Sequence, residues 1–484
     1  MVNSKKSQKS RPRRKLASSP EAPTSGHSLA IPLNAFLAEH LKPKSGLLLA
    51  LSGGLDSCVL LHLLAEAKSH ILFELHAMHV HHSLSPNADK WADFCSQQCQ
   101  QLQIPLQIVR LDIDKNSSLG VEAAARALRY EALFKHQSKV DCLDFVVTAH
   151  HQDDQAETLL LQLFRGAGIK GLSAMANVDH TTRLLRPLLN VPRAALSDYA
   201  KHYDIEWCED ESNNNTHYER NFVRHEVMPV LEARYPAIKS VIARTAAHIA
   251  EANHLLDSLA ALDAESLLKD NSLCLQGLRL LDPARAKNCL RWWFAQNQLL
   301  MPSAEHLNEV MGQLLDAKPD ANLSIQLTSK LLIDNQPQCL TLRRFQNRAY
   351  LNSQIINTQP MEAYDLVWNG ETQLMLPNGS QLEFKQVIGK GIALKLGINK
   401  LRITNRQGGE RFKPHAVRPT RTLKYLMQEA HIPPWQREQL PLIYWDDTLA
   451  YVPGIGIAHE LQASANEQGL EIMWRNVLAS NVIS

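Results

Sequence analysis

The chain has 484 residues, more than one hydrophobic core usually serves, so we expect roughly two or three domains. Hydrophobic content of 45% and charged content of 21% are those of an ordinary globular protein, and no apolar run approaches the roughly 20 residues that a membrane span needs. The net charge is only +2, so a nucleic-acid-binding surface would have to arise from local clusters of basic residues.

Residues 1–30 are expected to form a disordered basic tail. Seven basic residues precede the first acid, Glu21, and no apolar segment follows them, which argues against a secretory signal. An organelle transit peptide has a similar composition and stays open as an alternative to a tail with weak phosphate affinity. The eight cysteines form no C-x-x-C pair, a pattern that favours a reducing cytosol, so we expect a cytoplasmic protein with no membrane segment.

Apolar runs alternate with helical periodicity from Gly46 to about Val223. The strands are predicted at GLLLALS, ELHAMHV, LQIVRLD and LDFVVTA, and the helices over Asp56–Ala67, Ala88–Gln103, Val121–His136 and Asp153–Phe164. This alternation predicts a parallel sheet covered by helices on both faces. Ligands of such sheets bind beyond the carboxyl ends of the strands.

The rest of the chain has a different character. Helical periodicity dominates from about Met228 to Arg344, and a polar stretch near 352–360 precedes segments such as LMLPNGSQLEFKQV, which predicts two strands joined by a hairpin turn at PNGS. We therefore expect an α/β, Rossmann-like nucleotide-binding domain over 31–226. A helical middle domain over 227–350 and a small α+β C-terminal domain over 361–484 complete the predicted architecture.

The stretch SGGLDS lies between the first predicted strand and its helix. Its glycines allow backbone N–H groups to approach an anion, the helix N-terminus adds partial positive charge, and the serine hydroxyls can donate to phosphate oxygens. It lacks the lysine of a Walker A loop. A glycine-containing turn with a favourable first-turn acid is the simpler alternative. The predicted phosphate-binding loop consists of Ser52, Gly53, Gly54, Leu55, Asp56 and Ser57.

A second motif, VVTAHHQDDQAET, follows the fourth predicted strand. His150 ends the strand, and Asp154 and Glu157 stand three residues apart on one face of the next helix. Two clustered acids at a strand end can hold an ammonium group or a metal. Acids that merely favour a helix N-terminus are the simpler interpretation.

The loop resembles the PP-loop of the ATP pyrophosphatase superfamily, whose members bind the β,γ-pyrophosphate of ATP there and transfer AMP to a carbonyl oxygen. The resemblance implies ATP and Mg²⁺ as cofactors, with Asp56 holding Mg²⁺ together with the phosphates. Longer strings together resemble the tRNA(Ile)-lysidine synthase family from Gly46 to about His459. They are HVHHSLSPNADKWADFC, EAAARALRYEAL, AHHQDDQAETLLLQLFRGAGIKGL, RPLL, DESNNNTHYERNFVRHEVMP and, in the C-terminal part, NRQGGERFKP followed by RTLKYLMQEAHIPPWQREQLPLIY.

That resemblance implies a reaction in two steps. The wobble cytidine of a tRNA(Ile) with a CAU anticodon is adenylated at its C2 carbonyl, and the ε-amine of free L-lysine then displaces AMP. The product base, lysidine, pairs with A, so the tRNA reads AUA instead of AUG. The implied residues are Asp56, Arg126 and His150 for catalysis, Arg129 for phosphate or cytidine, Asp154 and Glu157 for lysine, and Arg220 and Arg224 for the adenylate or the anticodon.

The stretch 402–424 carries seven basic residues against one acid, Glu410. Because two glycines within it allow close backbone approach, we predict a tRNA phosphate surface that grips the acceptor stem without reading sequence. A solvated basic face is the alternative. The tRNA-binding residues predicted here are Arg411, Arg418, Arg421 and Lys424.

Other signals are weaker. Strand alternation keeps His76, His79, His81 and His82 from converging, so we expect them to shape an adenine pocket rather than bind a metal. The tryptophans of RWWF (Arg291–Phe294) are expected in a core, with base stacking as the alternative.

Three other functions would explain part of the sequence pattern. A tRNA 2-thiolation enzyme would need cysteines near the loop, and a glutamine-dependent synthetase would need a glutaminase domain. A non-catalytic tRNA-binding protein would not need the intact loop and acid helix. The oligomeric state is left open, a homodimer included.

Overall fold

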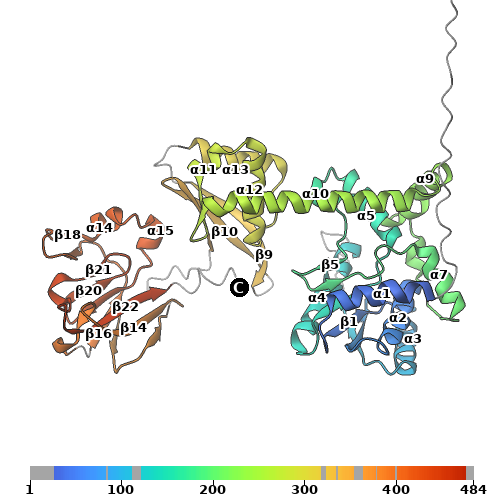
Figure 1. The fold of residues 1–484 in the computed structure, drawn as a ribbon, viewed down its shortest axis with the longest axis horizontal. Coiled ribbons are helices and arrows are strands. Elements are labelled where there is room, and N and C mark those ends of the chain that lie inside the picture. The colour runs from blue at the N-terminus through green and yellow to red at the C-terminus, as the bar shows by residue number, and fades with distance from the viewer. Residues whose placement is uncertain are drawn as a thin grey trace, which may run out of the picture. The chain divides into compact units, whose positions relative to one another are not determined.

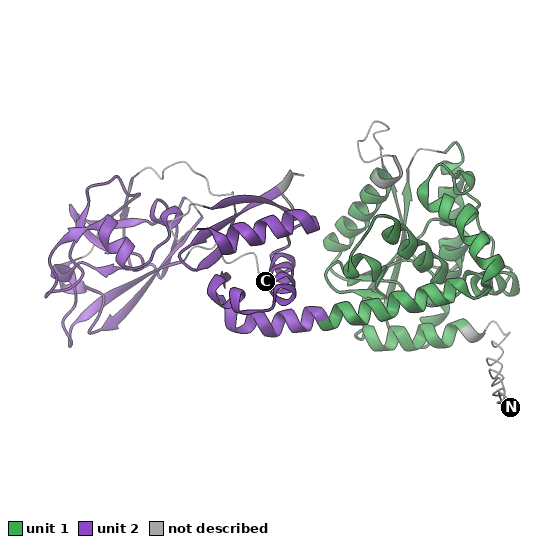
Figure 2. Ribbon diagram, turned by 90° about the horizontal axis from the view of Figure 1, so that it is seen from above, with its two compact units in different colours: residues 1–255 green, residues 256–484 purple. Residues whose placement is uncertain are grey.

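The structure, a computed structural model, describes residues 27–82, 85–111, 121–317, 323–333, 336–353, 363–377, 379–397 and 400–475 (Figure 1). The chain divides into two compact units, residues 1–255 and 256–484 (Figure 2). The division falls inside helix α10 (Ile238–Leu267). Most of the predicted basic tail lies outside the described residues, and helix α1 (His27–His40) includes its last four positions. The finer domain boundaries stay predictions.

Unit 1 contains a six-stranded sheet in the order β3-β2-β1-β4-β6-β5, in which the edge strand β5 is antiparallel and the other strands are parallel. The first four strands coincide with the four predicted ones, which confirms the α/β fold. The strands are β1 (Gly46–Ala50), β2 (Glu74–His81), β3 (Leu106–Arg110), β4 (Phe145–Val147), β5 (Val178–Asp179) and β6 (Leu184–Leu185).

Helices cover this sheet, and the four predicted ones are present to within a few residues at each end. The helical elements of unit 1 after α1 are α2 (Leu55–Ala67), α3 (Ala88–Gln101), α4 (Val121–Lys139), α5 (Gln152–Phe164), α6 (Ile169–Leu172), α7 (Arg193–His202), the 3-10 turn η1 (Glu211–Asn214), α8 (Glu219–Phe222), the π-helical turn η2 (Val223–Val227), α9 (Met228–Arg234) and the first half of α10.

Strand β1 is apolar throughout because both of its faces are covered. Leu47 and Leu49 pack in one core cluster with residues of α1 and α2, whereas Leu48 packs in another with Leu133 of α4. All three β1 leucines are fully buried. A strand with only one buried face would alternate apolar and polar residues. The central position of β1 brings the loop that follows it to the middle of the sheet's carboxyl edge.

Unit 2 begins with helices that pack against a five-stranded sheet in the order β7-β8-β11-β10-β9, a sheet that the sequence did not predict. Trp293 and Phe294 are fully buried in its core and Trp292 packs against it partly buried, which confirms the core interpretation of the RWWF tryptophans. The elements are α11 (Leu275–Leu280), α12 (Pro283–Gln296), α13 (Ala304–Asp316), β7 (Leu268–Lys269), β8 (Ser272–Cys274), β9 (Ser324–Ile333), β10 (Gln336–Phe345) and β11 (Arg348–Ser353).

The C-terminal part of unit 2 combines sheets with short helices. Its sheets have the orders β12-β16-β19-β20-β21, β13-β14-β22-β15 and β17-β18. The predicted hairpin joins β13 to β14 around PNGS, where Leu376 N donates to Ser380 O at 2.7 Å. The elements are β12 (Tyr364–Val367), β13 (Gln373–Met375), β14 (Gln381–Ile388), β15 (Ile392–Ala393), η3 (Leu394–Leu396), β16 (Lys400–Thr404), β17 (Arg411–Phe412), β18 (Arg421–Thr422), α14 (Leu423–Glu429), α15 (Pro434–Arg437), β19 (Leu442–Trp445), β20 (Thr448–Val452), β21 (Gly456–Ile457), η4 (His459–Leu461) and β22 (Gln468–Arg475). Across the described residues, no helix combines the length and apolarity needed to cross a membrane.

Candidate active site

The predicted phosphate loop forms a tight turn between β1 and α2. Gly53 has φ +86°, and a Cβ there would lie 3.1 Å from Cys95 Sγ, so the position requires glycine. Ser57 is buried and its hydroxyl donates to Gly54 O at 2.9 Å, which shapes the turn. Ser52 lies at the surface, with its Oγ 3.0 Å from Ser57 Oγ. The exposed hydroxyl and the N-terminus of α2 together offer donors to an anion.

Asp56 occupies the first turn of α2 and is partly unpaired. Its Oδ1 is buried with no hydrogen-bond partner among the described residues but lies 3.6 Å from Arg193 Nε, and its Oδ2 lies 3.5 Å from His151 Nε2. A carboxylate beside a phosphate loop, with one oxygen that accepts no hydrogen bond from the described residues, fits a Mg²⁺ ligand. The described residues contain no group of three His, Cys, Asp or Glu side chains that could hold a metal. A cation at Asp56 would therefore need further oxygens, which a bound nucleotide could supply.

Asp154 and Glu157 are both buried on α5, and two arginines close over them. Arg220 Nε donates to Glu157 Oε2 at 2.9 Å and its Nη2 donates to Asp154 Oδ1 at 2.8 Å. Arg224 Nε donates to Glu157 Oε1 at 2.6 Å. The sequence predicted separate roles for the acids and the arginines, whereas the structure joins them in one network. Burial alone would raise the pKa of Asp154, but the charges of His151 and Arg220 outweigh it and lower the pKa to about 2.

The two adjacent histidines have different surroundings. His150, predicted as catalytic, lies with its Nδ1 2.8 Å from Thr148 Oγ1, and burial lowers its pKa to about 3, so it is neutral. His151, which the sequence did not single out, is buried with its Nε2 3.4 Å from Asp154 Oδ2. Burial opposes the charging of His151, but Asp56 and Asp154 outweigh that effect and raise its pKa. His151 thus bridges the loop acid and the helix acid.

A group of guanidinium groups gathers around Tyr130 on α4. The Cζ atoms of Arg126 and Arg129 lie 5.3 and 5.9 Å from its ring centroid. Arg186 Nη1 donates to Ala176 O at 2.8 Å, whereas its Nε is buried with no hydrogen-bond partner among the described residues. Burial lowers the pKa of Arg129 and of Arg186, and the charge of Arg126 lowers both further. Sequence reasoning missed Arg186, although it begins the RPLL string.

Asp153 serves the scaffold rather than this network. Its carboxylate lies 2.7 Å from Lys239 Nζ of α10 and accepts a hydrogen bond from Arg193 N of α7 at 3.1 Å. Asp153 therefore ties α5 to two other helices, while Asp154 faces the arginines.

The histidines of β2 have partners in the scaffold. His79 Nδ1 lies 2.9 Å from Leu51 O, and His81 Nε2 lies 3.2 Å from Asp89 Oδ1. Burial lowers the pKa of His82 to about 4. Their role in an adenine pocket stays a prediction.

The predicted basic surface in unit 2 includes the β17–β18 hairpin. Arg411, Arg421 and Lys424 are exposed, whereas Arg418 is paired with Glu429 at 3.0 Å. Glu410 Oε1 accepts hydrogen bonds from two backbone N–H groups of the glycine turn, at 2.6 and 2.7 Å, so the one acid of the stretch shapes the turn.

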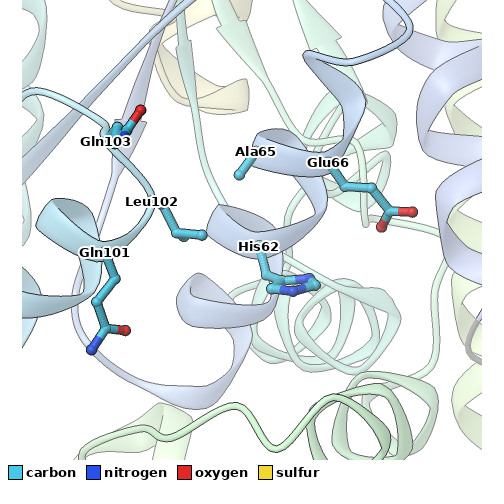
Figure 3. Close-up of a pocket in the computed structure, with 6 residues that line it drawn as sticks. All are labelled: His62, Ala65, Glu66, Gln101, Leu102 and Gln103. Carbon is cyan, nitrogen blue, oxygen red and sulfur yellow. The ribbon is translucent and has the colours of Figure 1, made fainter.

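A cavity of about 430 Å³ lies between α2 and the C-terminal end of α3 (Figure 3). Beside it, His62 Nδ1 lies 2.9 Å from Tyr199 Oη. No predicted site residue lines it. Its lining residues are His62, Ala65, Glu66, Gln101, Leu102 and Gln103.

The fold and the loop define unit 1 as a PP-loop domain, and the PP-loop domain family model matches residues 26–231. The models of the TilS substrate binding domain and the TilS substrate C-terminal domain match residues 273–350 and 401–474. The tRNA(Ile)-lysidine synthase of Nitrosomonas europaea is 42% identical over 90% of this chain and 93% of its own length. That of Coxiella burnetii is 37% identical over 89% and 94%. The chain belongs to the tRNA(Ile)-lysidine synthase family.

Among solved structures, the U34-tRNA thiolase NcsA from Methanococcus maripaludis matches with a TM-score of 0.42 and 19% identity, covering 46% of this chain and 78% of that one. A match at that level carries no argument about function.

Proposed function

We propose that the chain is an ATP-dependent ligase that joins free L-lysine to C2 of the wobble cytidine in tRNA(Ile) with a CAU anticodon. The observation that carries the proposal is the bridge from Asp56 through His151 to Asp154, which links the phosphate loop to the acid pair at distances of 3.5 and 3.4 Å. The two halves of such a reaction need these two sites side by side. Family membership along about nine tenths of the chain supports the same reaction.

The chemistry explains why both sites are needed. The C2 carbonyl oxygen attacks the α-phosphorus of ATP, pyrophosphate leaves, and the oxygen becomes part of a good leaving group. The ε-amine of lysine, having lost a proton, then forms a bond to C2 while the C2–O bond breaks and AMP departs. In our proposal the loop Ser52–Ser57 binds the pyrophosphate, and Asp56 holds Mg²⁺ with the phosphates.

The remaining site residues complete the proposal. Asp154 and Glu157 hold an ammonium group of the lysine substrate, a role that two buried carboxylates on one face of α5 can serve. Arg126 and His150 act at the reacting groups, while Arg220 and Arg224 bind tRNA or the adenylate. Arg186 joins this group because its buried Nε has no hydrogen-bond partner among the described residues and could donate to a bound anion. The basic surface of Arg411, Arg418, Arg421 and Lys424 grips tRNA in unit 2.

The cysteines near the loop favour a ligase over a 2-thiolation enzyme. Burial raises the pKa of Cys58 to about 12 and that of Cys99 to about 11. Sulfur transfer uses thiolates, and burial opposes their formation at these cysteines. All eight cysteines are free thiols, which supports our placement of the protein in the cytoplasm.

The stoichiometry of ATP consumption tests the reaction type. With tRNA(Ile) bearing CAU and lysine present, we expect equal amounts of AMP and pyrophosphate, and no AMP without tRNA. Release of ADP and phosphate would contradict the proposed adenylation, and binding of tRNA without any ATP consumption would favour a non-catalytic tRNA-binding protein.

A further inference from the structure

The acid pair proposed to bind lysine is fully occupied by arginines. Glu157 Oε2 accepts from both Arg220 Nε and Arg224 Nη2 at 2.9 Å, and its Oε1 accepts from Arg224 Nε at 2.6 Å. Asp154 Oδ1 accepts from Arg220 Nη2 at 2.8 Å and Arg224 Nη2 at 3.3 Å. The acid side chains are only 12% and 3% exposed.

The charges of this arrangement prevent a lysine ammonium from binding to the acids while both arginines are in place. Two carboxylates face two guanidinium groups, and His151 Nε2 lies 3.4 Å from the second oxygen of Asp154, so neither acid is left without a positively charged or hydrogen-bonding partner. A lysine ammonium would add a third cation to a buried site whose acceptor oxygens are already used. Burying an uncompensated charge is costly, so the ammonium must displace a guanidinium to bind.

A displaced arginine could bind instead to a phosphate at a neighbouring cluster of arginines. Arg126 and Arg129 lie over the Tyr130 ring, and the Arg186 side chain is hydrogen-bonded to Tyr130. Among the described residues, no carboxylate lies within ion-pair distance of these three guanidinium groups. Arg220 is close enough for its charge to lower the pKa of Arg129, whose main perturbation is burial. A cluster of like charges is relieved by an anion, and a phosphate bound there would also attract Arg220.

We propose that Arg220 and Arg224 keep the lysine site closed until a phosphate group binds at the neighbouring arginine cluster and draws the Arg220 guanidinium from Asp154 and Glu157. This inference rests on the proposed function, which assigns the acids to lysine. The phosphate belongs either to the tRNA backbone or to the nucleotide. In both cases lysine binds tightly only after a substrate of the first step, tRNA or nucleotide, is in place.

Direct binding measurements test this inference without turnover. Labelled lysine is titrated by equilibrium dialysis into the full chain alone, with tRNA(Ile) bearing CAU, and with AMP. We expect tRNA, AMP or both to raise lysine affinity by about 5- to 150-fold, the usual range for coupling between sites. The two additions distinguish backbone phosphate from nucleotide phosphate. Because coupling is reciprocal, lysine must raise the affinity for the effective partner by the same factor.

Variants of Arg220 and Arg224 test whether these arginines couple lysine binding to the binding of tRNA or AMP. Arg224→Gln should raise the lysine affinity of the chain without tRNA or AMP and reduce the coupling, since it frees acceptors on Glu157. Arg220→Gln gives a second variant should the first unfold. Arg165→Gln is the matched control, because Arg165 forms an exposed pair with Glu219 at 2.6 Å and should change neither quantity.

Three outcomes would overturn the inference. The first is a lysine affinity that neither tRNA nor AMP changes. The second is an arginine variant that binds lysine more weakly but binds cadaverine, which lacks the carboxylate, as before; the arginines would then hold the substrate's carboxylate. The third is no loss of lysine affinity in Glu157→Gln with tRNA present, which would remove the acids from lysine binding and so refute that part of the proposed function. If Glu157→Gln binds lysine more weakly but neither tRNA nor AMP changes the lysine affinity of the parent chain, only the closure by Arg220 and Arg224 is refuted, and the assignment of the acids to lysine stands.

Discussion

Replacing Asp154 by Asn removes one charge from the buried network at almost constant size. Oδ1 accepts from Arg220 and Arg224, while Oδ2 accepts from His151 N at 3.0 Å. The Asn side chain has one acceptor oxygen and one NH₂ group that carries two donors, so in either orientation its NH₂ group faces an N–H donor. Removing one partner of a buried ion pair costs about 3–5 kcal/mol. At 2–4 °C per kcal/mol for a unit of this size, the lower figure lowers the melting temperature by roughly 6–12 °C.

The kinetic effect of Asp154→Asn should appear in the KM for lysine. Losing a charge-assisted contact costs about 1.5–3 kcal/mol, so the KM for lysine should rise by roughly 10- to 150-fold, while the KM for ATP changes little. Asp153→Asn is the matched control, because the neighbouring carboxylate pairs with Lys239 instead of the arginines. It too should lose stability, but its KM for lysine should stay unchanged. Equal increases in the lysine and ATP KM values of Asp154→Asn, or the same lysine defect in both variants, would refute the reasoning.

Further predictions concern the loop, the basic surface and His150. Asp56→Asn should bind tRNA normally but release no pyrophosphate at saturating Mg²⁺, and near-normal turnover would remove its assigned role. Replacing Arg411, Arg418 and Arg421 together by Ala should raise the KM for tRNA and flatten its salt dependence by roughly 0.9 in log–log slope per phosphate contact, with kcat restored by excess tRNA; unchanged affinity would mean a solvated face. The pKa of His150 is lowered from 6.5 to about 3, so between these pH values the unfolded chain binds a proton that the folded chain does not. The free energy of unfolding is therefore at its full value above pH 6.5 and decreases as the pH falls toward 3. In urea unfolding, His150→Gln should therefore lose less stability than the parent chain between pH 6.5 and 3. The same dependence of unfolding free energy on pH in both proteins would contradict the lowered pKa of His150.

The fold of unit 1 could be predicted because its signals are local. Each buried strand is a short apolar run, and each helix has its own period. The five-stranded sheet β7-β8-β11-β10-β9 of unit 2 was not predicted because its strand pairing is not local in sequence. Strand β8 has three residues, and its partner β11 lies more than seventy positions away, with Leu273 opposite Ala349. No periodicity within either segment reports such a pairing.

The site shows the same division. Motif spacing identified Asp154, Glu157, Arg220 and Arg224 one by one, but the acids and the arginines that bind them are separated by 63 to 70 positions in the chain. Sequence spacing therefore gave no sign that they neutralise each other. The choice between the two histidines depends on the backbone at the start of α5, where His151 has extended geometry and faces the acids.

Transfer of lysine into RNA tests the central claim most directly. The full chain is incubated with ATP, Mg²⁺, labelled lysine and tRNA(Ile) bearing CAU, beside the same tRNA with a GAU anticodon. We predict label in the CAU tRNA that depends on ATP and is located at the wobble nucleotide after digestion, with none in the GAU tRNA. Absence of label from the CAU tRNA, or equal label in both tRNAs, would contradict the account.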